Sequence, residues 1–366
     1  MKLICDRHML AEALAATTAV ISTRTPKPIL QCVRLTATGD GLMLTAYDQE
    51  VGLRYRVAQV EVSKTGETLV SADRLASIVR ESSDETLTLE SKEDLLHVRG
   101  QDSHFQIYGQ SVREFPPVPE FEGEADYRIM AGMLASAVER TVFAAAKEST
   151  RYAINGVLWM RKGKKLQLIA TDGRRLAWTT LAIEKTRGED GDTQAIVPVK
   201  TLNLLTRLRG EADDPVDVKI QPNQILLRTP RATISSVLVE GHFPNYEEVV
   251  PRDCTRKAEL STPEFHSGVR RAALLTNEES KGVRLSFTEG GLVLSSRAPQ
   301  QGEATINVPA KLEGGAIEIG FNPVYLIDAL KACGETITIE MKEPTKPGLL
   351  RSGPDFLYVV MPVTLA

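Results

Sequence analysis

The chain has 366 residues, 42% of them hydrophobic, which is enough for two or three domains that each bury a core. A formal net charge of −4 excludes a surface that is basic all over, but it leaves room for a local basic patch that binds nucleic acid. The first ten residues carry charges where a signal peptide needs an apolar run, and no apolar run is long enough to span a bilayer, so we expect a cytoplasmic protein without a membrane contact.

The first third of the chain alternates predicted helices and strands in a fixed order. A helix-like stretch over 8–22, with apolar residues three and four positions apart, is followed by two alternating runs and a Gly-containing turn over 32–48, which predict a β-hairpin. A second helix is predicted over 71–81, with Ser71 at its start as a candidate cap. Three short strands follow, at 86–91, 95–100 and 105–111.

The same order returns twice farther along the chain. Helix-like stretches recur at 132–149 and 263–280, hairpins at 156–172 and 282–298, and second helices at 198–210 and 322–334. The last helix opens with Asn322 and a proline, which is typical of a capped first turn. Val33, Val157 and Val283 occupy equivalent positions, 124 and 126 residues apart, so the chain contains a threefold internal repeat.

Each repeat contains two halves with the order strand, helix and three strands. Two Pro-rich acidic segments, 113–126 and 241–253, read as linkers and predict domains at 1–122, 123–253 and 254–366. The fold class expected is α+β, with three tandem domains of two βαβββ halves each and helices that cover one face of the sheets.

Helix spacing limits what such an assembly encloses. Twelve helices from two chains in a head-to-tail ring, about 9 Å apart, leave an opening of about 24 Å, whereas six leave only about 7 Å. A DNA duplex about 20 Å thick passes only the larger opening. Basic residues at exposed helix positions fit a lining that holds phosphates through salt-sensitive contacts, although ordinary solvated helix faces explain the charges equally well. These residues are Arg74, Arg80, Arg140, Lys147, Lys200, Arg207 and Arg209.

The sequence offers little support for catalysis or for a metal or cofactor. It contains no P-loop, GxSxG or HExxH motif, its four cysteines form no CxxC pair, and its five histidines form no ligand-spaced cluster. Asp172 in the segment TDGRR is the one candidate acid, and we expect it to shape the turn before Gly173 instead. A repeat protein that binds peptides without DNA remains the other alternative.

Six motifs in this order resemble the bacterial DNA polymerase III beta subunit family, the sliding clamps, over the whole chain. They are RYAINGVLW (151–159), IATDGRRLAW (169–178), GHFPNYEEVVP (241–251), NEESKGVRLSF (277–287), IGFNPVYLIDAL (319–330) and YVVMPV (358–363). The resemblance implies a non-catalytic, homodimeric ring of six clamp domains, with helices lining the hole and sheets outside. It also implies that the ring encircles double-stranded DNA, is opened by a clamp loader, and tethers the replicative DNA polymerase and other proteins that carry clamp-binding peptide motifs.

The resemblance also implies three sets of site residues. A partner-peptide pocket between the second and third domains would use Ile154, Thr171, Gly173, Arg174, Arg175, Leu176, Pro244, Val249, Asn322, Tyr325, Pro347, Val360, Met361, Pro362, Val363 and Leu365. DNA would be contacted by Arg24, Arg74, Lys147, Arg151, Tyr152, Lys200 and Arg207. The dimer would be held by Ile78, Phe105 and Ile107 of the first domain against Leu274 and Leu275 of the third. Ser280 and Glu248 depart from residues often found in the family, so pocket entry and motif preference are expected to differ here.

Overall fold

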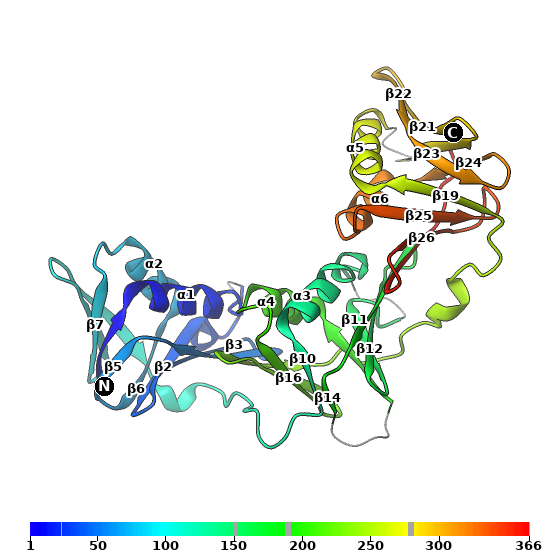
Figure 1. The fold of residues 1–366 in the computed structure, drawn as a ribbon. Helices are drawn as coiled ribbons and strands as arrows, with labels where there is room; N and C mark the ends of the chain where they lie inside the picture. Colours follow the sequence, from blue (N-terminus) through cyan, green and yellow to red (C-terminus); the bar gives the residue numbers. More distant parts are fainter. Residues whose placement is uncertain (23, 149–151, 187–191, 209, 277–281, 366) are drawn as a thin grey trace. The chain divides into compact units, whose positions relative to one another are not determined.

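The computed structural model describes every residue except 23, 149–151, 187–191, 209, 277–281 and 366 (Figure 1). The chain forms two compact units, and neither is a continuous segment. The first unit comprises Met1–Ala135, Ile183–Glu189 and Lys200–Leu238, and the second comprises Ser136–Ala182, Asp190–Val199 and Val239–Ala366. The middle third of the chain is therefore divided between the two units.

The first unit contains the first third of the chain and half of the middle third. Its elements are β1 (Lys2–Asp6), α1 (Arg7–Thr18), β2 (Cys32–Thr38), β3 (Gly41–Tyr47), β4 (Val51–Val57), β5 (Val60–Lys64), β6 (Gly66–Ser71), α2 (Ala72–Glu81), β7 (Thr86–Lys92), β8 (Leu95–Arg99), β9 (His104–Gln110), β10 (Tyr127–Met130), the start of α3 (Ala131–Glu139), β14 (Lys185–Thr186), α4 (Val199–Arg207), β16 (Pro215–Ile220), β17 (Gln224–Arg228) and β18 (Ala232–Val237). The strands form one antiparallel sheet in the order β14-β10-β16-β17-β18-β4-β3-β2-β6-β9-β8-β7-β1-β5.

One face of this sheet carries the helices. In Figure 1, α1, α2 and α4 lie on the same side of the strands, and α1 packs against α2. Strand β2 shows why: Val33, Leu35 and Ala37 are buried, whereas Arg34 and Thr36 between them are only half-buried. Helix α1 begins where Asp6 Oδ1 accepts a hydrogen bond from Met9 N at 2.9 Å, which satisfies an amide that has no partner within the helix.

The second unit contains the other half of the middle third and the last third. Its elements are β11 (Gly156–Lys162), β12 (Lys165–Thr171), β13 (Arg175–Ala182), β15 (Thr193–Pro198), β19 (Arg256–Ser261), α5 (Thr262–Ala272), β20 (Val283–Thr288), β21 (Gly291–Ala298), β22 (Gly302–Val308), β23 (Ala310–Glu313), β24 (Ile317–Phe321), α6 (Pro323–Leu330), β25 (Thr336–Met341), β26 (Gly348–Ser352) and β27 (Phe356–Val360). Nine strands form one sheet, β15-β11-β12-β13-β27-β26-β25-β19-β23, and four form another, β22-β21-β20-β24. Helices α5 and α6 pack against each other.

Each unit joins two repeats through a shared sheet. In the first unit, β4 of the first repeat pairs with β18 of the second, from Ala232 with Tyr55 to Ser236 with Val51. In the second unit, β13 of the second repeat pairs with β27 of the third, from Arg175 with Val360 to Thr179 with Phe356. We call these pairings the first joint and the second joint. Both are antiparallel, and both connect the last strand of one half to the last strand of another.

The predicted order of strand, helix and three strands is confirmed in all six halves, and one short strand that was not predicted, β5, β14 or β23, lies between the two halves of each repeat. The stretches predicted as long helices are wrong at their ends, because α3 and α5 give way to short 3-10 helices, η3 (Val142–Ala144) and η5 (Ala273–Leu275). Asn322 caps α6 as predicted, with Oδ1 accepting from Val324 N at 3.0 Å. Ser71 is wrong as a side-chain cap: it ends β6, makes no capping hydrogen bond and faces a hollow instead.

Candidate functional site

The turn between β12 and β13 forms one wall of the second joint. Asp172 Oδ1 accepts hydrogen bonds from Arg174 N at 2.9 Å and Arg175 N at 3.1 Å, and Thr171 Oγ1 donates to the Arg175 carbonyl at 2.6 Å. Gly173 has a φ of 85°, a left-handed conformation that favours glycine. These bonds confirm that Asp172 shapes the turn, as the sequence suggested.

A cavity of about 180 Å³, the joint cavity, lies beside this turn. Nine of the residues predicted for the peptide pocket line it: Ile154, Thr171, Gly173, Arg174, Arg175, Leu176, Pro244, Val249 and Met361. Four further residues line it that were not assigned to the pocket: Tyr152, Asn245, Tyr246 and Val359. Most of the lining is apolar with an arginine pair at one edge, which suits a short peptide with apolar side chains.

Tyr246 anchors the floor of the joint cavity. It lies on the 3-10 helix η4 (Tyr246–Val249) and is buried in a cluster with Leu176 and Val359. Its ring packs edge-on against Trp178, with centroids 5.2 Å apart. Tyr246 of the second linker therefore belongs to the cavity, and the tyrosine within GHFPNYEEVVP is the sequence signal that would have identified it.

Arg175 fastens the side of the joint cavity. Its Nε bonds Asp172 Oδ2 at 3.0 Å, its Nη1 bonds Asp328 Oδ2 at 3.0 Å on α6, and its Nη2 donates to the Phe143 carbonyl at 2.7 Å. The guanidinium also lies over the Tyr325 ring, 4.6 Å from its centroid. Burial lowers the pKa of Arg175, but the bond to Asp328 and the nearby Asp172 charge outweigh that effect and hold it above its ordinary value. Arg175 therefore stays charged and holds two repeats together.

The other predicted pocket residues lie outside the joint cavity. Asn322 and Tyr325 lie on or beside α6, Val360 ends β27, and Pro347 immediately precedes β26. The chain after Met361 runs along β24, where Val363 N donates to the Gly320 carbonyl at 2.9 Å. Pro362 and Leu365 belong to this same final segment, in which Leu365 lines a separate hollow with Arg284 and Arg297. The assignment of these seven residues to a peptide site stays a prediction.

The two residues that depart from the family pattern have different outcomes. Glu248 is exposed on η4, where Asn245 Nδ2 donates to its carboxylate, so a negative charge lies at the rim of the joint cavity. Ser280 lies outside the described residues.

The residues predicted for DNA contact differ in their local surroundings. Arg24, Arg74, Lys147 and Arg207 are exposed, and Arg151 lies outside the described residues. Tyr152 lines the joint cavity. Lys200 donates to the Val20 carbonyl at 2.9 Å and forms an ion pair with Asp48, so it already has partners at the first joint.

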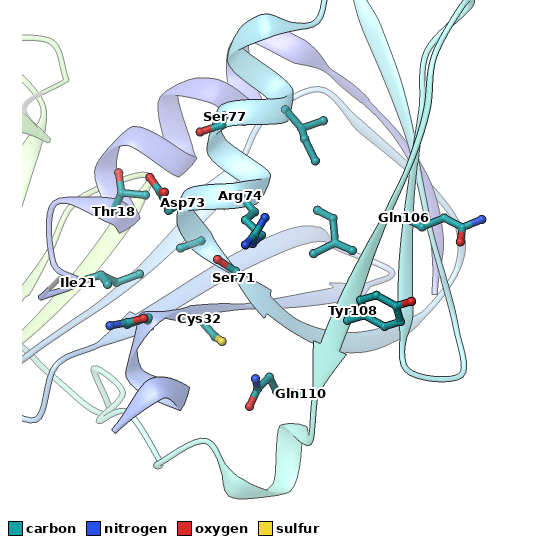
Figure 2. A pocket seen from close by; sticks show the side chains of 14 residues that line it. Thr18, Ile21, Cys32, Ser71, Asp73, Arg74, Ser77, Gln106, Tyr108 and Gln110 are labelled. Atoms are coloured by element: carbon teal, nitrogen blue, oxygen red, sulfur yellow. The ribbon is translucent and has the colours of Figure 1, made fainter. Parts of the chain in front are cut away.

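The residues predicted for the dimer contact lie on two surfaces. Ile78 of α2 and Ile107 of β9 line a hollow of about 1160 Å³, the edge groove. Figure 2 shows its walls, with Asp73, Arg74 and Ser77 of α2 on one side and Gln106, Tyr108 and Gln110 of β9 on the other. Phe105 is 41% exposed on β9, and Leu274 is 78% exposed on η5 beside the half-buried Leu275. Tyr108, 84% exposed, is the apolar edge residue that sequence reasoning missed.

Three family models match the chain in order. They describe the N-terminal, central and C-terminal domains of the DNA polymerase III beta subunit and match residues 1–119, 128–245 and 247–364. The chain belongs to the DNA polymerase III beta subunit family. Its function is accordingly that of a polymerase processivity clamp, a non-catalytic subunit.

Relatives and solved structures agree with this assignment over full length. The chain is 33% identical to the beta sliding clamp of Pseudomonas aeruginosa and 30% identical to that of Escherichia coli K12, with all of both chains covered. It also resembles the crystal structure of the sliding clamp from P. aeruginosa bound to griselimycin, with a TM-score of 0.94 at 32% identity. A sliding clamp structure from Bacillus subtilis gives a TM-score of 0.94 at 26% identity. Both structures are covered completely, as is the chain.

The family matches begin and end near the domain limits expected from the linkers, 1–122, 123–253 and 254–366, which stay a prediction. None of the helices in the described residues is long and apolar enough to cross a membrane.

Proposed function

We propose that two copies of the chain pair head to tail into a cytoplasmic ring that encircles double-stranded DNA, slides along it, and holds DNA polymerase and other partners by a peptide in the joint cavity. The observation that carries this proposal is the repeated strand joint. The last strand of each half-repeat is β4, β9, β13, β18, β22 or β27. Four of them pair within the chain as the first and second joints, which leaves β9 and β22.

Both remaining strands have an open edge among the described residues. Strand β22 pairs only with β21, and it ends its sheet. Strand β9 pairs with β8 at residues 104–108 and with β6 only at Gly109 and Gln110, so residues 104–108 have no second neighbour among the described strands. An unpaired strand edge invites another strand. We therefore expect a third joint of the same kind, in which β22 of one chain pairs with β9 of another.

The internal joints also predict the register of this pairing. Counting through the hairpins, Arg54, Trp178 and Thr305 are equivalent, because they pair with Thr45, Ile169 and Ser295 at matching positions. In the same way His104, Thr233 and Leu357 are equivalent, because they pair with Arg99, Arg228 and Arg351.

Within the chain, Arg54 pairs with Thr233 at the first joint, and Trp178 pairs with Leu357 at the second. The third joint then pairs Thr305 with His104 of the second copy. Glu303 falls opposite Gln106, and Gly302 opposite Ile107. Leu274, exposed on η5, would enter the edge groove beside Ile78.

Sedimentation velocity tests the ring. Replacing Leu274 and Leu275 together by alanine should shift the dimer to monomer, because the exposed apolar anchor is lost. Val324→Ala, which shortens another exposed apolar side chain on α6, is the matched control and should leave the dimer intact. An unaltered sedimentation profile for the double variant would contradict the proposal.

Fluorescence anisotropy tests the peptide site, with a labelled synthetic peptide that carries a glutamine followed by apolar and aromatic residues. Deletion of residues 361–366 should abolish binding and leave the dimer, and Met361→Ala should weaken it. The matched control is Val237→Ala, since Val237 occupies the position at the first joint that Met361 occupies at the second, with similar exposure. Peptide affinity unchanged by the deletion would remove the joint cavity as the site.

A closed DNA circle tests the topology. A loaded clamp should stay on the circle and be lost when the circle is cut, whereas a peptide-binding repeat protein without a ring is indifferent to DNA ends. Arg74 on α2 and Arg207 on α4 are exposed on helices that lie on one side of the first unit's sheet (Figure 1), which supports a basic lining there. Arg24→Ala should lower the efficiency of loading by a clamp loader more than retention, and equal loading would remove Arg24 from the DNA contact.

A further inference from the structure

Two histidines meet on the open edge of the first unit. His97 of β8 and His104 of β9 lie two pair positions apart on the same face of the sheet. The distance between His97 Nδ1 and His104 Nε2 is 3.0 Å, and the rings stack with centroids 5.2 Å apart and planes inclined by 23°. His104 is exposed and His97 half-buried, so a solute reaches the pair.

We propose that His97 and His104 bind one divalent transition metal ion, and that Glu303 of a second copy completes the site at the third joint. Imidazole nitrogens are common ligands of Zn²⁺, at about 2.0 Å from the metal. Two nitrogens on one tetrahedral ion are then about 3.3 Å apart. The nitrogens observed here lie close to that spacing, and rotation of the rings about their side-chain bonds would direct both lone pairs at one ion.

One carboxylate and two cations lie beside the pair, so their formal charges sum to +1. Glu90 lies opposite His97, and its carboxylate contacts Arg99 and Lys92 at 3.3 Å each. In the described part of the chain no third histidine, cysteine or carboxylate completes a metal site, so one copy supplies two ligands and leaves positions for water.

The third ligand depends on the proposed ring. In the register of the third joint, Glu303 of the second copy lies opposite Gln106, and Gln106 lies opposite His97. Glu303 is then the diagonal neighbour of His104. Diagonal neighbours lie about 7–8 Å apart at their backbones, within reach of a glutamate and a histidine. The Glu303 side chain is 67% exposed, and within the described part of the chain its one ion pair is with Arg297, at 3.1 Å. Its carboxylate is therefore available to exchange a surface arginine for a metal ion.

Such a site couples metal binding to ring closure. If the second copy adds a ligand, the metal tightens the dimer by the same factor by which dimerisation tightens the metal, and we expect about tenfold. Apo chains would then open at this edge more readily than metal-bound ones.

Isothermal titration of the full chain with zinc chloride, at pH 8 where free imidazole is neutral, tests the histidine pair. We expect one site per chain that is lost in both His97→Gln and His104→Gln. His8→Gln, at an exposed histidine on α1, is the matched control and should keep the site. Zinc binding that is the same in His104→Gln and wild type would overturn the assignment.

Sedimentation velocity with and without zinc tests the contribution of Glu303. The dimer dissociation constant of the wild type should fall about tenfold with zinc, and that of Glu303→Gln should not change. Zinc that binds the histidines without tightening the wild-type dimer would overturn the role of Glu303. A chain that is monomeric at every concentration but still loses zinc binding in His104→Gln would instead refute the ring and support the histidine pair, so the two failures are distinguishable.

Discussion

The first and second joints share one construction. Each has five antiparallel residue pairs, and in each a turn with a hydrogen-bonding aspartate precedes the first of the paired strands. Asp48 Oδ1 accepts from Glu50 N at 3.0 Å and Val51 N at 2.7 Å, as Asp172 accepts from Arg174 and Arg175. Residue two of the turn is left-handed in both, with φ of 84° at Gln49 and 85° at Gly173.

The joints differ in what fills the space beside the turn. At the first joint the β3 strand ends in Tyr47, whose ring packs with Val118 of the first linker against the Cys32, Leu69 and Phe115 cluster. A Cβ at Gly52 would lie 2.5 Å from Val118 Cγ1, so this joint is closely packed. At the second joint the equivalent positions hold Thr171 and Leu176, and both line the joint cavity. One scaffold is therefore closed where Tyr47 and Val118 fill the space beside the turn, and open where Thr171 takes the place of the tyrosine.

The joints also differ in the cation that ties them. Lys200 pairs with Asp48 and the Val20 carbonyl, and its side chain is 40% exposed. Arg175 makes three bonds and stacks on two rings, and its side chain is 11% exposed. The second joint, which contains the cavity, thus has the more buried cation. Its bonds hold the cavity walls in place although no side chain fills the space between them.

The largest effect is expected for Arg175→Ala. Removing Arg175 takes the buried cation away from Asp172 and Asp328, which keep only the turn amides and Lys331 as partners among the described residues, and should cost about 3 kcal/mol of unfolding free energy. Denaturant unfolding followed by tryptophan fluorescence measures it, because Trp159 and Trp178, the only tryptophans of the chain, both belong to the second unit. Lys200→Ala, followed by circular dichroism, should cost less than about 1 kcal/mol, because Lys200 is 40% exposed and Asp48 keeps its hydrogen bonds from Glu50 N and Val51 N. Equal losses of unfolding free energy in the two variants would show that Arg175 and Lys200 do not differ in how much they stabilise their joints.

A smaller effect is expected for Asp217→Asn on the sheet of the first joint. Asp217 on β16 accepts from Arg128 Nε at 2.7 Å and from Arg228 Nη2 at 2.7 Å, and its side chain is 9% exposed. The substitution removes the negative charge that both arginines share and should cost about 2 kcal/mol at pH 7. Glu340→Gln is the control, since it faces Arg351 in the second unit with more exposure and should cost less.

The stability lost in Asp217→Asn should depend on pH. Burial raises the pKa of Asp217, but hydrogen bonds and charges from Arg128 and Arg228 outweigh burial and hold the pKa below its ordinary 3.8. A lowered folded-state pKa adds stability that is complete above the unfolded value and is lost as pH falls through the folded one. The stability difference between wild type and Asp217→Asn should therefore be constant at neutral pH and shrink below about pH 4. A difference independent of pH down to that range would contradict the ion pair.

Thr171→Tyr should close the joint cavity as Tyr47 closes the first joint. A tyrosine ring in a space of 180 Å³ excludes a peptide side chain, so we expect at least a tenfold loss of peptide affinity, about 1.4 kcal/mol. Anisotropy with the labelled peptide measures it, and Tyr47→Thr should leave that affinity unchanged. A Thr171→Tyr protein that still unfolds like wild type and binds the peptide equally well would show that side-chain size at this position does not govern entry.

The sequence predicted the repeat, the six half-repeats and the turn at Asp172, because these depend on periodicities and turn chemistry that lie within short segments. It did not predict the partners of Lys200, since Asp48 is 152 residues away and a lysine at an exposed helix position looks solvated. Tyr47 and Thr171 end equivalent strands. Nothing in the neighbouring sequence shows that the tyrosine ring fills the first joint or that the threonine borders a cavity. Val359 was missed for a related reason: it is buried in the core cluster and still reaches the cavity, so strand alternation assigns it only to the core.

The smallest effects concern the left-handed turn residue, and they should have opposite signs. Gly173→Ala places a Cβ in open space, so its only cost is the left-handed backbone, about 1 kcal/mol. Gln49→Gly relieves the same strain at the first joint but adds freedom to the unfolded chain, so its gain should be smaller than that loss. Tryptophan fluorescence measures the first change and circular dichroism the second. If Gly173→Ala does not lower the free energy of unfolding, the second turn must adopt a different φ once residue 173 has a side chain. The two turns would then not share one rigid backbone conformation.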